Sequence, residues 1–70
     1  MKLTTREKEI LQYACLSYEN ISKKLHISKS TVRTHFENIL NKFPNSENRQ
    51  GCLIEALQNG EIHLEEVVIE

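Results

Sequence analysis

A short polar connection between two helix-forming segments, residues 25–32, constrains the fold of this chain most. Ser28 is a favourable N-cap, because its hydroxyl oxygen can accept a hydrogen bond from a free N–H group of the first helical turn. Ile27 and Val32 flank this cap with the spacing of a hydrophobic staple, which sets the angle at which the chain enters the helix. A turn of about three residues held in this way is typical of a helix-turn-helix, whose helices cross at about 90 to 120°.

A first helix is predicted before this connection. Thr4 and Glu7 have the spacing of a capping box, so the helix should begin at Thr5. Its apolar positions repeat at helical spacing and predict a helix that continues to near Leu16. The predicted buried face consists of Ile10, Leu11, Ala14 and Cys15.

The two helices of the helix-turn-helix follow from the same reasoning. Ser17 caps a short helix from Tyr18 to Leu25, in which Ile21 and Leu25 dock on the first helix. The helix after Ser28 is predicted from Lys29 to Leu40. Its buried face is expected to consist of Val32, Phe36, Ile39, Leu40 and Phe43.

A fourth helix is predicted after Pro44, which cannot continue the third. Ser46 or Asn48 caps it, and Asn59-Gly60 ends it. Its apolar stripe consists of Cys52, Leu53, Ala56 and Leu57. The sequence therefore predicts an all-α fold, a four-helix bundle with a helix-turn-helix, in residues 1–62. Residues 63–70 form an acidic and apolar tail, for which a short extended and a helical conformation both stay open.

Length and composition narrow the class of protein. A chain of 70 residues buries a thin core and needs further support, and a second subunit can supply it. Cys15 and Cys52 have no partner at zinc-ligand spacing, so we expect small apolar core residues in a reduced, cytoplasmic protein, with no metal or cofactor. No stretch is long and apolar enough for a membrane span, and no small-molecule ligand is evident. Neither a glycine-rich loop nor a nucleophile beside a base points to an enzyme.

The distribution of charge favours a nucleic acid more than the net charge of −1 does. Between residues 17 and 49, six basic residues stand against three acidic residues, whereas every charge from Glu55 onward is negative. The middle of the chain can therefore face a polyanion while the C-terminal end points away from it.

The polar face of the predicted third helix has the chemistry to read bases. Arg33 can donate two hydrogen bonds to guanine, Thr34 can contact thymine, and Glu37 can accept from cytosine. Ser30 lies on this face and is included, although its place near the start of the helix also suits a phosphate, as does that of Thr31. The alternative interpretation of this face is an ordinary solvated surface. Residues predicted to position the DNA backbone electrostatically are Lys23, Lys24, Lys29, Lys42 and Arg49.

Three segments resemble the LuxR/GerE DNA-binding domain of bacteria. They are Leu3-Thr4-x-Arg6-Glu7-x-Glu9-Ile10-Leu11, Ile21-Ser22-x-x-Leu25-x-Ile27-Ser28-x-x-Thr31-Val32-Arg33-x-His35, and Asn38-Ile39-x-x-Lys42-Phe43. The resemblance resumes at Asn48-Arg49 and continues to Ile62. It implies a bacterial transcription regulator that stands alone, like GerE, because the pattern begins at the third residue.

The resemblance also implies roles for single residues. It assigns base contacts to Arg33, Thr34 and Glu37, and a fourth helix that commonly supplies a two-fold dimer contact. Residues implied to lie nearer the DNA backbone are Thr31, His35, Asn38 and Lys42. Glu37 departs from the family, in which a basic or small residue is commoner. The segment between Leu11 and Ile21 is about two residues shorter than the family pattern, which predicts a clipped first helix.

Two functions are carried forward. The first is a sequence-specific regulator that binds double-stranded DNA as a homodimer, with the helix from Lys29 to Leu40 in the major groove. Residues expected at the dimer interface are Leu53, Leu57, Val67, Val68 and Ile69. The second is a non-enzymatic interaction module that binds RNA polymerase or another regulator through the acidic fourth helix and tail.

Overall fold

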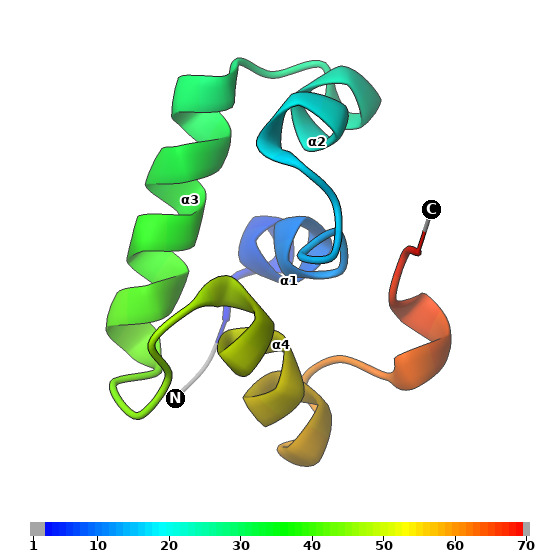
Figure 1. The fold of residues 1–70 in the computed structure, drawn as a ribbon. Helices are drawn as coiled ribbons and strands as arrows, with labels where there is room; N and C mark the ends of the chain where they lie inside the picture. Colours follow the sequence, from blue (N-terminus) through cyan, green and yellow to red (C-terminus); the bar gives the residue numbers. More distant parts are fainter. Residues whose placement is uncertain (1–2, 70) are drawn as a thin grey trace.

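A side-chain cap starts each α-helix in the part of the chain that the structure, a computed structural model, describes, which is residues 3–69. The helices are α1 (Thr5–Leu11), α2 (Tyr18–Leu25), α3 (Lys29–Lys42) and α4 (Arg49–Gln58), and a 3-10 helix η1 (Leu64–Glu66) follows (Figure 1). The caps are Thr4, Ser17, Ser28 and Asn48, each accepting a hydrogen bond from a backbone N–H three residues on. The predicted all-α fold is therefore confirmed, and α3 runs to Lys42 rather than to Leu40.

The predicted end of the first helix, near Leu16, is wrong, because α1 ends at Leu11. After Leu11 the chain continues in tight turns, in which Tyr13 N–H donates to Ile10 O at 3.0 Å and Ala14 N–H to Leu11 O at 3.0 Å. Such i→i+3 bonding turns the chain by more per residue than an α-helix does. Cys15 is consequently exposed rather than in the core, and Leu16 is buried at 3% exposure.

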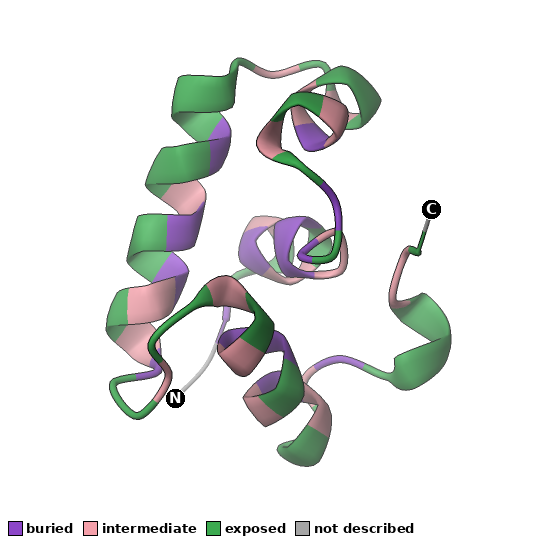
Figure 2. Cartoon of the chain, in the orientation of Figure 1, coloured by how far each residue is buried: buried purple, intermediate pink, exposed green. Residues whose placement is uncertain are grey.

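α3 packs against α1, α2 and α4, and this contact forms the centre of the core. Val32, Phe36 and Ile39 supply the α3 side, with at most 1% of their surface exposed. Figure 2 shows the buried residues of each helix facing inward and the exposed ones facing out. The predicted core faces of α3 and α4 are confirmed, except that Leu40 and Leu57 are partly buried at its edge.

Gly60 ends α4, as the sequence predicts, with a left-handed φ of 79°. Glu61 N–H donates to Ala56 O at 3.0 Å and Gly60 N–H to Leu57 O at 3.3 Å, the bonding of a Schellman motif. The tail then returns to the end of α1, where Val68 N–H donates to Gln12 O at 2.9 Å. It forms a 3-10 turn and an extended stretch on the side of the molecule opposite to α3 (Figure 1).

No helix within the described part of the chain has the length and hydropathy to cross a membrane. This finding concerns residues 3–69 alone.

His26 ends α2 in the left-handed conformation, with φ 57° and ψ 43°. This conformation costs a residue with a Cβ atom about 1 to 2 kcal/mol, and glycine avoids the cost. His26 is exposed and its N–H donates to Ser22 O, a bond that glycine can also make.

The variant His26→Gly should therefore be more stable than the wild-type chain, by about 0.5 to 1 kcal/mol after the added entropy of glycine in the unfolded chain. Urea unfolding followed by circular dichroism measures the difference. His26→Ala is the control, because it removes the imidazole and keeps the Cβ atom. Equal stability of the glycine and alanine variants would contradict the argument from backbone conformation.

Candidate nucleic-acid interface

The polar face of α3 is exposed and lies on the side of the helix away from the core. Ser30, Arg33, Thr34 and Glu37 are all exposed, whereas Val32 between them is fully buried. The side chains of Arg33 and Glu37 take part in no ion pair or hydrogen bond within residues 3–69, so both can contact a ligand without breaking an internal contact. The tail does not cover this face (Figure 1).

The hydroxyl groups of Thr31 and Thr34, near the start of α3, already have partners inside the chain. Thr34 Oγ1 donates to Ser30 O at 3.0 Å, so the methyl group of Thr34 is its free surface. Ser28 Oγ accepts from Thr31 N–H at 3.1 Å and lies 2.9 Å from Thr31 Oγ1. Thr31 is exposed, but its hydroxyl must give up or share this contact to bind a phosphate.

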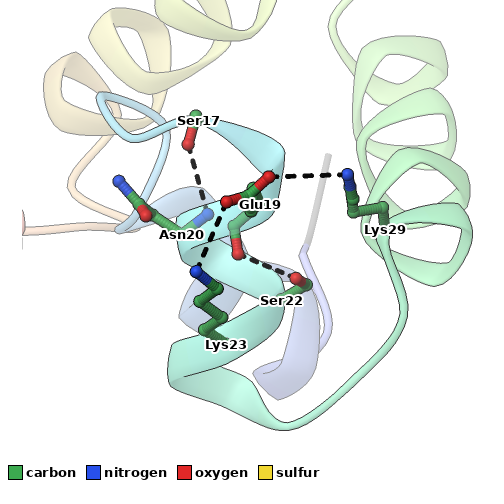
Figure 3. Close-up of polar contacts among 6 residues, drawn as sticks. All are labelled: Ser17, Glu19, Asn20, Ser22, Lys23 and Lys29. Carbon is green, nitrogen blue, oxygen red and sulfur yellow. Dashed lines mark hydrogen bonds and ion pairs between the residues drawn. The ribbon is translucent and has the colours of Figure 1, made fainter.

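The lysines of the helix-turn-helix are exposed, as the sequence predicts. Lys23 and Lys24 lie in the last turn of α2, and Lys29 is the first residue of α3. Lys23 and Lys29 each form an ion pair with Glu19, a residue that the sequence analysis did not single out (Figure 3). An i, i+4 spacing in the sequence signals the pair with Lys23, whereas the pair with Lys29 depends on the angle between the helices.

Lys42 has a structural contact that the sequence analysis did not foresee. Its Nζ donates to Glu7 Oε1 and joins the last turn of α3 to the first turn of α1. The same oxygen accepts from the Thr4 amide at 2.9 Å, and Glu7 is 7% exposed. The role of Lys42 at the DNA backbone stays a prediction.

Burial by itself raises the pKa of Glu7. The hydrogen bonds from Lys42 and Thr4 and the charge of Lys42 lower it by more, so the pKa lies below its ordinary value. Because the pKa of Glu7 is lower in the folded chain than in the unfolded chain, its ionised form stabilises the fold. This stabilisation is complete at pH values above the pKa of the unfolded chain, which is about 4.3. This stabilisation is lost as the pH falls through the lower, folded pKa.

We expect Glu7→Gln to lower the free energy of unfolding at pH 7 by about 1 to 3 kcal/mol, because an amide cannot replace the charged acceptor. Thermal unfolding between pH 7 and pH 3 should show a smaller acid-induced loss in this variant than in the wild type. Glu9→Gln is the matched control, because Glu9 pairs with Arg6 at the surface. A steep acid loss that persists in Glu7→Gln would argue against this role of Glu7.

Arg49 also lies within the helix junction rather than entirely at the surface. Its guanidinium carbon is 4.8 Å from the centre of the Tyr18 ring and 5.5 Å from that of Phe36, and these two rings stack at 5.7 Å. Its Nη1 is buried and has no hydrogen-bond partner in residues 3–69. Arg49 thus joins α4 to α2 and α3 by cation–π contacts, and its predicted phosphate contact is untested.

His35 is half-buried on α3 next to Phe36, whereas Asn38 is exposed one residue beyond the predicted base-contacting Glu37. Successive residues of an α-helix are about 100° apart, so Asn38, four residues after Thr34, borders the polar face, whereas His35 lies further round α3 from Arg33 and Glu37. The resemblance places contacts with the DNA backbone at both residues. These contacts stay predictions.

The apolar residues predicted at a dimer interface divide into two groups. Leu53 is 6% exposed and belongs to the core of its own chain, and Leu57, Val67 and Val68 are partly buried against that core. Ile69 is 76% exposed. Ile54 of α4 and Leu64 of η1, which the sequence analysis did not select, are 56% and 75% exposed.

The cysteines and the interior offer no other chemistry within residues 3–69. Burial raises the pKa of the Cys52 thiol, which favours its neutral form. Cys15 and Cys52 are both free cysteines. No group of three histidine, cysteine or acidic side chains that could hold a metal ion occurs there, and no pocket is enclosed.

The arrangement of α2 and α3, with an exposed polar face on α3, places this protein in the class of helix-turn-helix proteins, and comparison with known proteins gives its family. Residues 1–56 match the family of bacterial regulatory proteins described as the luxR family. The chain is 42% identical over 59 residues to the uncharacterized transcriptional regulatory protein YxjL of Bacillus subtilis (strain 168), an alignment that covers 81% of this chain and 27% of the relative. It is 42% identical over 60 residues to the transcriptional regulatory protein DegU of Brevibacillus brevis, with 83% and 25% covered.

The chain therefore belongs to the luxR family of bacterial regulatory proteins, as its resemblance to the LuxR/GerE domain predicts. It spans about a quarter of the length of the curated relatives that it matches. No solved structure shows a significant match. The family is one of regulators rather than enzymes.

Proposed function

We propose that this chain binds double-stranded DNA and regulates transcription, with α3 in the major groove. Membership of the luxR family and relatives named as transcriptional regulatory proteins support this function. The observation that carries it is the exposed polar face of α3, on which Arg33 and Glu37 have no internal partner within the described residues. A protein that acts on a bacterial chromosome works in the cytoplasm.

The proposed base contacts follow from the free atoms on this face. The guanidinium of Arg33 donates to O6 and N7 of a guanine, and the carboxylate of Glu37 accepts from N4 of a cytosine. The hydroxyl of Thr34 is held by Ser30 O, so its methyl group is proposed to contact a thymine methyl. Ser30 lies in the first turn of α3, where it is proposed to contact a phosphate or a base edge.

The proposed backbone contacts rest mainly on exposed side chains. Lys23, Lys24 and Lys29 lie together at the helix-turn-helix, and Thr31 and Asn38 are exposed on α3. His35, Lys42 and Arg49 are less exposed, so we assign them a smaller share of the phosphate contacts. The affinity should fall as the salt concentration rises, because each phosphate contact releases counterions. The fall should be less steep than for a large basic domain, which neutralises more phosphates.

Arg33→Ala tests the proposed base contact. The probe is a duplex enriched by the wild-type chain from a randomised library, and the measurement is the dissociation constant by gel shift. We expect a loss of about 1 to 3 kcal/mol on the enriched duplex and little loss on a scrambled one. Arg6→Ala is the control, because it removes the same charge from α1, where Arg6 pairs with Glu9. Equal binding by Arg33→Ala and wild type would remove Arg33 from the reading face.

We further propose that the chain acts as a homodimer bound to two half-sites about one helical turn apart. The proposal takes the exposed apolar residues Ile54, Leu64 and Ile69 of α4 and the tail as parts of one partner surface, because contiguous exposed apolar patches mark sites of protein interaction. Leu57, Val67 and Val68 are partly buried against the core and Leu53 belongs to it, so these four residues are proposed to contribute less to the interface than the exposed Ile69.

Sedimentation velocity at micromolar concentrations should therefore give a dimer. Ile54→Glu should shift the chain to a monomer with unchanged helix content, because Ile54 is exposed and its replacement leaves the core intact. A wild-type chain that sediments as a monomer throughout this range would contradict the dimer.

The second candidate is a contact with RNA polymerase or another regulator. The exposed Leu64 and Ile69 beside Glu65 and Glu66 favour it, since they offer an apolar and acidic surface away from α3. Salt separates the two functions, because DNA binding weakens steeply with added salt and an apolar protein contact does not.

A further inference from the structure

Glu19 lies where the two helices of the helix-turn-helix meet, between two lysines of the proposed phosphate-binding set. Its Oε2 is 3.3 Å from Nζ of Lys23, one turn further along α2. Its Oε1 is 3.6 Å from Nζ of Lys29, the first residue of α3. Figure 3 shows the carboxylate between the two ammonium groups, so it links α2 to α3 through its two oxygens.

This carboxylate offers the lysines the same chemistry as a DNA phosphate, which is a pair of anionic oxygens: one accepts a hydrogen bond from Lys23 and the other forms an ion pair with Lys29. A phosphate that approaches Lys23 or Lys29 must therefore replace Glu19 or share the lysine with it. The side chains are 57% exposed for Glu19, 71% for Lys23 and 64% for Lys29. The exchange consequently needs side-chain rotation alone and no movement of the helices.

We infer that Glu19 competes with the DNA backbone for Lys23 and Lys29 and thereby limits the sequence-independent part of the affinity. This inference rests on the proposed function. Contacts with phosphates position a protein on DNA but carry no direct sequence information. Glu19 therefore lowers the affinity for every duplex by a similar factor and leaves discrimination between sequences to the face that contains Arg33.

Glu19 is a permanent competitor and is not needed to form α2. The hydrogen bond from Lys23 and the charges of Lys23 and Lys29 hold its pKa below the ordinary value, so it stays ionised at neutral pH. The helix is started by Ser17, whose Oγ accepts from the Asn20 N–H at 3.2 Å (Figure 3). Exposed ion pairs contribute little to folding stability, so an uncharged residue at position 19 should leave the fold intact.

The test compares Glu19→Gln with Glu9→Gln, measured by fluorescence anisotropy on the library-enriched duplex and on a scrambled duplex from about 50 to 200 mM salt. Both variants remove one exposed negative charge, but Glu19 forms ion pairs with Lys23 and Lys29, whereas Glu9 pairs with Arg6 on α1. Glu19→Gln should bind both duplexes more tightly at low salt. The slope of log K against log salt should steepen by about one, which is an additional loss of about fourfold across this range.

A background without the two lysines tests the route of the effect. In the variant Lys23→Gln, Lys29→Gln, the further change Glu19→Gln should no longer alter the affinity or the slope, because the groups through which it acts are absent. Equal slopes for Glu19→Gln and Glu9→Gln, or weaker binding by Glu19→Gln, would each overturn the inference. It would also be overturned if Glu19→Gln changed the affinity as much in the background without Lys23 and Lys29 as in the wild-type chain. A wild-type chain without salt-dependent DNA binding would instead refute the proposed function, and the inference with it.

Discussion

The burial of one side of α3 is the interaction on which the rest of the structure depends. Val32, Phe36 and Ile39 are almost fully buried, and the helix contacts α1, α2 and α4 through this side. Because an α-helix repeats every 3.6 residues, the commitment of these positions to the core leaves Arg33 and Glu37 facing outward. The proposed base-reading face is thus the complement of the core face, and the register of the core residues decides which side chains face outward.

Contacts that are local in the sequence could be predicted from it, and contacts that depend on tertiary geometry could not. The caps at Thr4, Ser17 and Ser28 involve groups three residues apart, and each is present in the structure. The end of α1 was missed because tight turns and an α-helix accept the same residues. The resulting change of direction exposes Cys15 and buries Leu16 instead.

The candidate site shows the same division. The exposure of Arg33, Thr34 and Glu37 follows from helical periodicity, which is a local property. Lys42 contacts Glu7, and Arg49 contacts Tyr18 and Phe36, all of which lie far away in the sequence. The sequence therefore could not show which basic side chains have a partner inside the chain. The internal partners of these basic side chains depend on how the helices cross.

The cation–π contacts of Arg49, the first residue of α4, with the rings of Tyr18 in α2 and Phe36 in α3 have a mechanical consequence. A helix held at its first residue by two rings cannot slide past its neighbours without separating the guanidinium from both of them. The contacts of Arg49 add to the packing of α3 against α2 and α4, and together they favour a fixed arrangement of these three helices. A subunit that docked on α4 would then impose a fixed distance and tilt between the two copies of α3, and the spacing of the two DNA half-sites would be determined by the protein rather than adjusted by it.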